Sequence, residues 1–248
     1  MSDKQLHSDA FFARSANKLD FGSWSDKEKI ALSCRILASE GHSETLAGQI
    51  TARKDDGTFL TTPMAHAFDE VLPASVIRIN DSMEVLEGPG TPNPAVRFHF
   101  WVYRRRPDVH CIIHTHPPYV STLSMTGQPL VVAHMDATPF HKDCAHLKEW
   151  RGLPIADQEG EIISEALSDK RCILLANHGF LAAGANVEEA LYLSVLIERA
   201  ARNQLLAAAA YGSVKPVNDE LAGESHDFLL KPRIVRGTFG MFGGRVGD

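Results

Sequence analysis

The sequence predicts a mixed α/β fold, in which short apolar strands alternate with helices. Two apolar runs of strand length, residues 111–116 and 172–177, contain β-branched side chains. An Asp-Gly pair within residues 54–57 lies between two further short runs, which is a strong hairpin signal. Helices with recognisable starting signals begin near residues 25 and 186. One large domain is enough for 248 residues, although the length alone also allows two.

The individual elements follow from caps, turns and hydrophobic spacing. Ser25 and Glu28 form a capping-box pattern ahead of apolar residues, which predicts a helix over residues 25–40. Asn186 begins a long helix rich in alanine and leucine that is expected to end near Tyr211. The other predicted strands are residues 49–53, 58–61, 75–80, 85–88 and 130–133, and further helices are predicted near residues 99–103, 117–125 and 162–167.

The composition limits the classes of partner and location. A formal net charge of −6 provides no general basic field, so we expect no nucleic-acid partner. The four cysteines lack Cys-x-x-Cys spacing and at least two lie in predicted buried segments, which is typical of reduced thiols in a cytoplasmic protein. No apolar stretch reaches 18 residues and no signal-peptide pattern begins the chain, so we expect no membrane span and a cytoplasmic location.

The strongest functional pattern is a pair of histidines at the end of the first apolar run. Side chains alternate along a strand, so His114 and His116 point to one face while Thr115 points to the other. His178 ends the second apolar run, where Gly179 is expected to permit the turn. If both strands end at one sheet edge, the three imidazoles can bind one divalent ion, either Zn, Mn, Fe or Co. The alternative is that each histidine is a hydrogen-bonded structural residue, but the combined pattern favours metal binding.

Two other groups of polar residues are candidates for catalysis. Arg97 lies just before His99, which begins a predicted helix, and a cation beside an imidazole is suited to anchoring a carboxylate. The alternatives are an ion pair for Arg97, which is about as well supported, and a packed, hydrogen-bonded His99. Residues 134–146 are rich in titratable groups, and His134 or Asp136 could deliver a proton at neutral pH. For any single residue of that loop, a contact with water or backbone is the alternative.

Three motifs occur together around the histidines: Arg-Pro-Asp-Val at 106–109, His-Thr-His-Pro at 114–117 and Ala-Asn-His-Gly at 176–179. In this combination the chain resembles the class II aldolase/adducin family over roughly residues 25–211. The resemblance implies a three-layer α/β/α fold with a central, largely antiparallel sheet. It also implies one divalent metal ion per subunit, a small-molecule substrate and a homotetramer with sites at the subunit boundaries.

The chain is expected to divide into three parts. Residues 1–24 are expected to form an N-terminal arm that packs late or against a neighbouring subunit, and residues 25–212 form the metal-binding domain. Residues 213–248 form a C-terminal tail, which covers an active site in several members of the family. Phe239 of this tail is therefore expected to line an aromatic substrate pocket, and Tyr119 is a second expected substrate contact because it follows the metal strand closely.

Several positions depart from the phosphosugar aldolases of this family. Gln49 stands where those aldolases carry an asparagine that helps hold the phosphate, and Asn93 lies where they carry serines. Ala95 stands at the position of their metal-binding, proton-transferring glutamate, and Met135 lies near the position of their tyrosine acid. A phosphorylated substrate and a retro-aldol reaction that uses this glutamate are therefore not expected, and Gln49 is kept as a substrate contact.

The resemblance and its departures favour a metal-dependent carbon–carbon lyase. The first hypothesis is a decarboxylase of a hydroxylated aromatic or heteroaromatic carboxylic acid, since the family has such a branch. In this hypothesis Arg97 orients the acid, and a histidine or Asp136 delivers the proton. The alternatives are a class II aldolase for a non-phosphorylated substrate and an Fe(II)-dependent oxygenase that decarboxylates oxidatively. A non-catalytic adducin-like module is least favoured, because a scaffold has no need for three convergent histidines.

Overall fold

The computed structural model describes residues 3–15, 23–42 and 45–246. Within them, one mixed sheet of eight strands has the order β4-β3-β2-β1-β5-β8-β7-β6, and all neighbours are antiparallel except the parallel pair β6 and β7. The strands are β1 (Gln49–Arg53), β2 (Phe59–Thr61), β3 (Ile77–Ile79), β4 (Val85–Glu87), β5 (Cys111–Thr115), β6 (Cys144–Leu147), β7 (Cys172–Leu175) and β8 (Gly179–Gly184).

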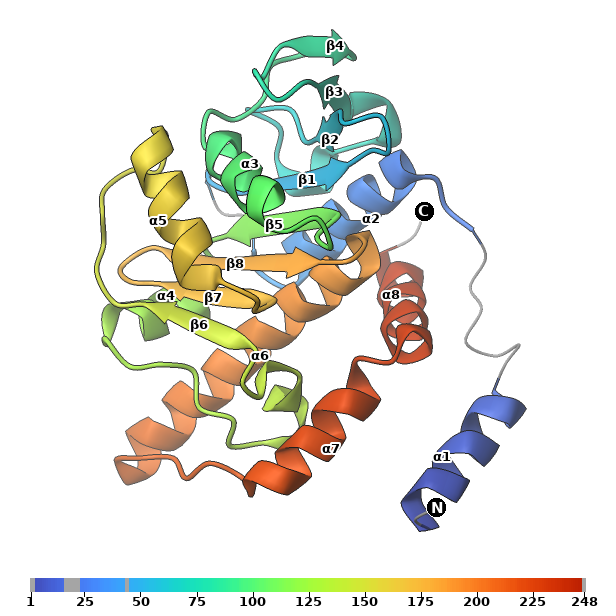
Figure 1. The fold of residues 1–248 in the computed structure, drawn as a ribbon, viewed down its shortest axis with the longest axis vertical. Coiled ribbons are helices and arrows are strands. Elements are labelled where there is room, and N and C mark those ends of the chain that lie inside the picture. Colours follow the sequence, from blue (N-terminus) through green and yellow to red (C-terminus); the bar gives the residue numbers. More distant parts are fainter. Residues whose placement is uncertain (1–2, 16–22, 43–44, 247–248) are drawn as a thin grey trace.

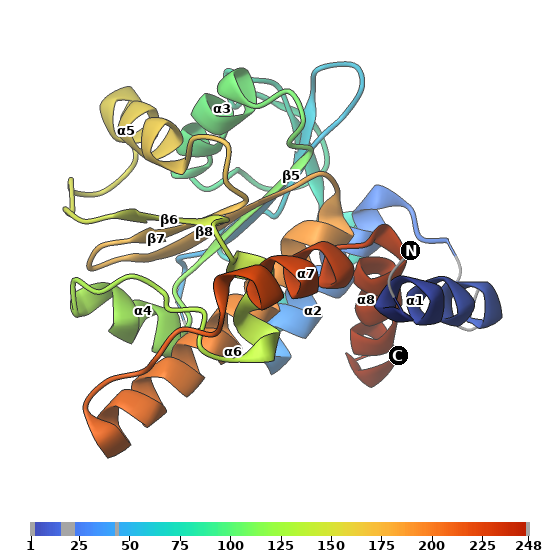
Figure 2. The same cartoon turned by 60° about the horizontal axis from the view of Figure 1, so that its bottom comes forward.

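Helices cover both faces of this sheet, which confirms the predicted three-layer arrangement (Figures 1 and 2). One face carries α3 (Val96–Arg105) and α5 (Asp157–Leu167), and the other carries α2 (Asp26–Ser39), α4 (Pro118–Met125) and α6 (Val187–Tyr211). The remaining α-helices lie near the two ends of the chain: α1 (Asp3–Arg14) at the N-terminal end, and α7 (Asp219–Leu229) and α8 (Pro232–Val246) at the C-terminal end. In the described part, no helix combines the length and the apolar character needed to cross a membrane.

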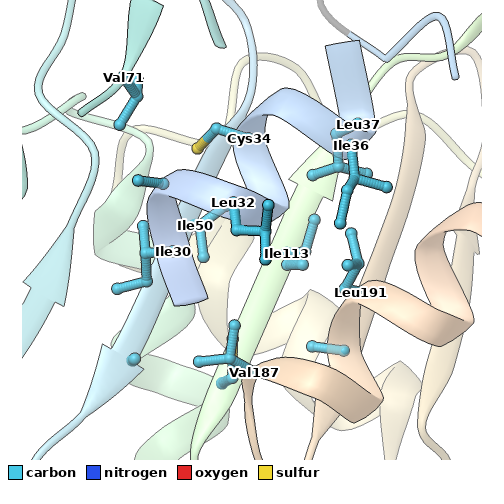
Figure 3. Close-up of a cluster of buried hydrophobic side chains, with 14 of the residues drawn as sticks. Ile30, Leu32, Cys34, Ile36, Leu37, Ile50, Val71, Ile113, Val187 and Leu191 are labelled. Carbon is cyan, nitrogen blue, oxygen red and sulfur yellow. The ribbon is translucent and has the colours of Figure 1, made fainter. Parts of the chain in front are cut away.

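The hydrophobic core follows from the alternation of side chains along the central strands. On β5, Ile113 packs toward α2 while Ile112 packs toward α3, so this strand is buried on both faces. Helix α2 begins with the predicted capping box, in which Ser25 and Glu28 satisfy each other's free backbone amides. Figure 3 shows the apolar side chains of α2 above Ile113 and beside the start of α6.

The structure corrects two sequence-based predictions of strands. Residues 130–133 do not form a strand, because the amide of Val131 donates to Gln204 Oε1 at 2.8 Å and the carbonyl of Val132 accepts from Val217 N at 2.9 Å. These contacts are to α6 and to the segment after it, not to a neighbouring strand. A strand instead forms later, at β6, which begins inside the predicted loop 134–146 and ends at Leu147. Its partner β7 is not a neighbour in the sequence, so no local pattern indicates that residues 144–147 form a strand.

The two ends of the chain pack differently. Helix α1 has no buried residues, and Phe12 contacts Phe228 with ring centroids 5.7 Å apart. Residues 1–2 and 16–22 of the predicted N-terminal arm lie outside the described residues. Helix α8 packs on α2, so closely that a Cβ on Gly243 would lie 2.9 Å from Leu32 Cδ2. The tail is therefore an integral part of the core in this chain, at least over α8.

Candidate metal centre

Strand β5 brings two of the predicted histidines to its carboxyl end. Because Ile112 faces α3, His114 faces the same helix, and its ring lies 5.1 Å from the ring of Phe98. Thr115 points to the opposite face, as predicted, where its hydroxyl is 2.9 Å from Nδ1 of the buried His42. His114 also donates from Nδ1 to the carbonyl of Phe180 on β8, at 2.6 Å. This hydrogen bond leaves His114 Nε2 as the unprotonated nitrogen.

His178 lies in the short turn that joins β7 to β8. Asn177 takes the left-handed conformation with φ 54°, which asparagine tolerates better than most residues, whereas Gly179 has no positive φ. A Cβ on Gly179 would lie 2.6 Å from Thr115 O and 2.8 Å from His116 Cδ2. The prediction that Gly179 permits the turn is therefore wrong. Asn177 makes the turn, and Gly179 leaves room for the strand and ring of His116.

The three histidines converge at this edge of the sheet. One ring nitrogen from each of His114, His116 and His178 lies within 4.8 Å of the others. The ring centroids are 4.8 Å apart for His114 with either partner and 4.5 Å apart for His116 with His178. The Nε2 atoms of His114 and His116 are only 3.0 Å apart. No other group of three such ligand residues was found among the described residues.

The electrostatics of the cluster fit a bound cation. Burial lowers the pKa of all three imidazoles, and for His178 burial and the neighbouring His116 lower it to about 4. The rings are therefore neutral at physiological pH and offer lone pairs instead of positive charges. Two nitrogens that face each other at 3.0 Å need a shared proton or a cation between them. Three neutral imidazoles suit a divalent metal ion and leave further coordination positions open.

A comparison with known families identifies the relatives of this arrangement. Residues 28–205 match the family described as "Class II Aldolase and Adducin N-terminal domain". The chain belongs to this family. It is 33% identical over 201 residues to the 4-hydroxy-3-prenylphenylpyruvate oxygenase/4-hydroxy-3-prenylbenzoate synthase of Streptomyces roseochromogenus subsp. oscitans, a match that covers 79% of this chain and 72% of that protein.

Other members of the class II aldolase/adducin family differ in their reactions. The chain is 28% identical over 218 residues to the 3,4-dihydroxyphthalate decarboxylase of Arthrobacter keyseri, with 81% of this chain and 86% of that protein covered. Its fold matches the solved L-fuculose 1-phosphate aldolase from Glaciozyma antarctica PI12, with a TM-score of 0.79, 28% identity, and 89% and 88% of the two chains covered. The relatives thus include decarboxylases and aldolases, and the predicted fold is confirmed.

Gln49 lies directly beside His114 of the histidine cluster. It pairs with His114 in the antiparallel register of β1 and β5, so the two side chains leave the sheet on the same face. Gln49 is almost fully buried, and its Nε2 has no hydrogen-bond partner among the described residues. A buried amide without a partner is costly, so this nitrogen is available to a ligand oxygen. Its role as a substrate contact stays a prediction.

His99 is brought to the same layer but is enclosed by protein. Its Nδ1 lies 2.8 Å from the hydroxyl of Thr51, and that hydroxyl also contacts Tyr103 Oη at 2.8 Å. Complete burial lowers the pKa of His99 to about 3, so the ring is neutral. This arrangement favours the packed, hydrogen-bonded alternative over proton transfer, and the proposed catalytic role remains untested. Ala95, at the position of the aldolase glutamate, precedes the same helix and provides no side-chain cap.

Arg97 and Tyr119 lie at the starts of helices on opposite layers. The Arg97 side chain is 46% exposed, and its Nη1 lies 3.9 Å from Asp157 Oδ1 on α5. Trp101 Nε1 donates to the same carboxylate oxygen at 3.2 Å. Tyr119 lies on α4, where the guanidinium of Arg202 stacks over its ring at 5.5 Å. Neither side chain is in contact with the three histidines in any described interaction, and their substrate roles stay predictions.

His134, Asp136 and Phe239 lie away from the three histidines within this chain. His134 accepts a hydrogen bond from the amide of Asp136 at 3.1 Å and begins the 3-10 helix Met135–Phe140. Both residues line a pocket against α6, and none of the three histidines lines that pocket. Phe239 is buried in the core, with its ring 5.7 Å from that of Trp24. Core packing does not support the expected contact of Phe239 with substrate.

Two glutamates near the site were missed by sequence reasoning. Glu198 of α6 accepts hydrogen bonds from Tyr119 N at 2.9 Å and Val120 N at 2.8 Å, which fixes the start of α4 just after β5. Burial raises the pKa of Glu198. Glu159 of α5 lines a pocket together with His178. No local pattern distinguishes these residues from the many exposed glutamates on helices.

Proposed function

We propose that the protein is a metal-dependent decarboxylase of a hydroxylated aromatic or heteroaromatic carboxylic acid. Three convergent neutral histidines, together with Ala95 at the aldolase glutamate position, carry this proposal. The relative named 3,4-dihydroxyphthalate decarboxylase supports it, as does a second relative named Decarboxylase NovR, at 33% identity over 201 residues. In this proposal, His114, His116 and His178 bind one divalent ion per subunit.

The chain's own residues would bind and orient the acid. A divalent ion, when bound, supplies Lewis-acid stabilisation of the negative charge that develops on the substrate. Gln49 Nε2, which is buried and lacks a partner among the described residues, donates to a substrate oxygen. Arg97 is only loosely paired at 3.9 Å, so it can exchange Asp157 for the substrate carboxylate.

The decarboxylation itself breaks one carbon–carbon bond and needs one proton. The electron pair of that bond stays on the ring carbon, carbon dioxide leaves, and a proton then adds to the same carbon. His134 and Asp136 are our candidates for the proton donor, directly or through water. They line a separate pocket in one chain, so in this proposal they act on the site of a neighbouring copy in a homotetramer.

An oxygenase is the second candidate, and one observation favours it. A relative at 33% identity is named as an oxygenase that acts on a prenylated hydroxyphenylpyruvate, and three histidines can also hold Fe(II). An aldolase for a non-phosphorylated substrate is the third candidate, because several relatives are named as aldolases. The retained histidine cluster argues against a non-catalytic module.

Metal analysis of freshly purified protein, combined with gas measurements, tests this proposal. The protein is incubated with a panel of hydroxylated aromatic acids while carbon dioxide release and oxygen uptake are recorded. Metal-dependent carbon dioxide release without oxygen uptake is the expected result. Coupled oxygen uptake with bound iron would replace the proposal by the oxygenase. Stoichiometric metal without either signal would replace it by aldol chemistry, and protein without metal would revive the non-catalytic module.

A further inference from the structure

Residues 148–156, which connect β6 to α5, expose three large apolar side chains. Trp150, Leu153 and Ile155 are 61%, 66% and 46% exposed. These three large side chains fall within six positions of a segment that has no regular secondary structure. In Figure 1 this connection runs along the left side of the view, up to the start of α5. Grouped apolar side chains in water mark a surface that is buried by something else.

The segment is held at both of its ends, and its first end lies close to His178 of the histidine cluster. At the first end, Ala176 N donates to Leu147 O at 3.0 Å, two residues before His178. At the other end, Asp157 accepts from Trp101 of α3. Trp150 lines a narrow pocket, and His178 and Glu159 line the same pocket. Because Trp150 is also largely exposed, its indole stands at the solvent side of this pocket.

The pocket contains a polar atom that lacks a partner. Oε2 of Glu159 is buried and has no hydrogen-bond partner among the described residues. A carboxylate oxygen only accepts hydrogen bonds when ionised, so it needs a donor such as a hydroxyl group and repels a second carboxylate. Leu147, Ile163 and Leu175 provide apolar surface in the pocket. Glu149 and Arg151, which form an ion pair with each other, also line it. The free space of the pocket is about 20 Å³, room for about one water-sized group, so a ring hydroxyl fits inside it while the ring itself lies outside, against Trp150.

We propose that residues 148–156 form the ring-binding wall of the active site. Trp150 stacks on the substrate ring, and Glu159 Oε2 accepts a hydrogen bond from a ring hydroxyl. The inference rests on the proposed function, because it takes the substrate to be a hydroxylated aromatic acid, and it adds the two residues that select this class. The exposed indole becomes buried when the ring binds, which accounts for its exposure in the free chain.

Binding of two acids to the metal-loaded full-length protein tests the inference without turnover being required. The probes are 3,4-dihydroxybenzoate and benzoate, which share a ring and a carboxylate and differ in the hydroxyl groups, and their Kd values are measured by calorimetry. The variants are Trp150→Leu and Glu159→Leu. Their matched controls are Leu153→Ala, which is exposed on the same segment but does not line the pocket, and Glu161→Leu on the same helix.

Trp150→Leu is expected to weaken the binding of both acids about tenfold, since stacking depends only on the ring. Glu159→Leu is expected to weaken the binding of 3,4-dihydroxybenzoate about tenfold and to change the binding of benzoate little. The two Kd values would then approach each other. Both controls should stay within about twofold of the unaltered protein. Circular dichroism spectra that match the unaltered protein show that the variants are folded.

Three results would overturn the inference: an unchanged Kd in Trp150→Leu, an equal effect of Glu159→Leu on both acids, or no binding of either acid. A Trp150→Leu variant that lowers the oligomer mass in ultracentrifugation and leaves both Kd values unchanged would assign the segment to a contact between copies instead. The proposed function fails separately. If Trp150→Leu weakens binding but the protein releases no carbon dioxide, the decarboxylase proposal fails and the ring-binding wall stands. If the protein releases carbon dioxide but Trp150→Leu leaves binding unchanged, the ring-binding wall fails and the decarboxylase proposal stands.

Discussion

Gly179 lies directly against the ring of His116, so a Cβ at position 179 would be 2.8 Å from His116 Cδ2. We therefore predict that Gly179→Ala displaces the His116 ring and weakens metal binding by about 10- to 100-fold, as is typical when the support of a ligand is changed. Competition with a chelator of known affinity measures the effect. Gly244→Ala is the control, because nothing lies within 4 Å of a Cβ there. Unaltered affinity in Gly179→Ala would show that the ring has room to move.

The three histidines should each be needed for metal binding, because one ion requires all three nitrogens in this geometry. We expect His114→Ala and His178→Ala to lower the bound metal to less than about a tenth of the unaltered protein. Elemental analysis after dialysis provides the measurement. His110→Ala is the control, since His110 precedes the same strand but is exposed. Full metal content in His114→Ala would remove the basis of the metal centre.

Phe239 provides a test between a core residue and a substrate contact. Its ring is almost fully buried against α2 and Trp24, so Phe239→Ala should cost about 3–5 kcal/mol of the free energy of unfolding. Urea unfolding followed by circular dichroism measures this cost. Phe11→Ala on α1, where the ring is partly exposed, should cost much less. Unchanged stability together with weaker substrate binding would restore the aromatic pocket predicted from the sequence.

His226 should make the docking of α7 depend on pH. Its Nε2 lies 3.3 Å from Oδ2 of the buried Asp143, and this hydrogen bond raises the pKa of His226, helped by Asp227 and opposed by burial and by Arg171. Arg171 also forms an ion pair with Asp143. A raised pKa means that the folded state holds the proton more tightly. The stabilisation is therefore complete below the unfolded pKa of about 6.5 and is lost as pH rises through the higher folded value.

We expect the melting temperature to fall between about pH 6 and pH 8.5 by more in the unaltered protein than in His226→Asn, which lacks the titrating group. Calorimetry across this range provides the comparison. His66→Asn is the control, because His66 is exposed and has only a long contact to the Met64 carbonyl. Parallel pH profiles for the unaltered protein and His226→Asn would contradict the prediction.

Much of the local structure could be predicted because its causes are local. Ser25 and Glu28 lie within one helical turn and cap each other, so their spacing was sufficient to place α2. The Asp-Gly turn placed the β1–β2 hairpin in the same way, since Lys54 N bonds to Thr58 O. The prediction of a strand at residues 130–133 was wrong. The apolar pattern there is typical of a strand, but the backbone bonds to α6 instead of to a neighbouring strand.

The sequence by itself determined that His114 and His116 share a face, because that follows from the two-residue period of any strand. It also marked His178 as the candidate third metal ligand, through a motif at the end of a second apolar run. Only the tertiary structure decided that these ends meet and that Asn177, not Gly179, makes the turn. It also decided that Gln49 and Glu159 each have a buried atom with no partner in the described part of the chain. These features depend on which strands and helices pack side by side, and that is set by contacts between residues far apart in the chain.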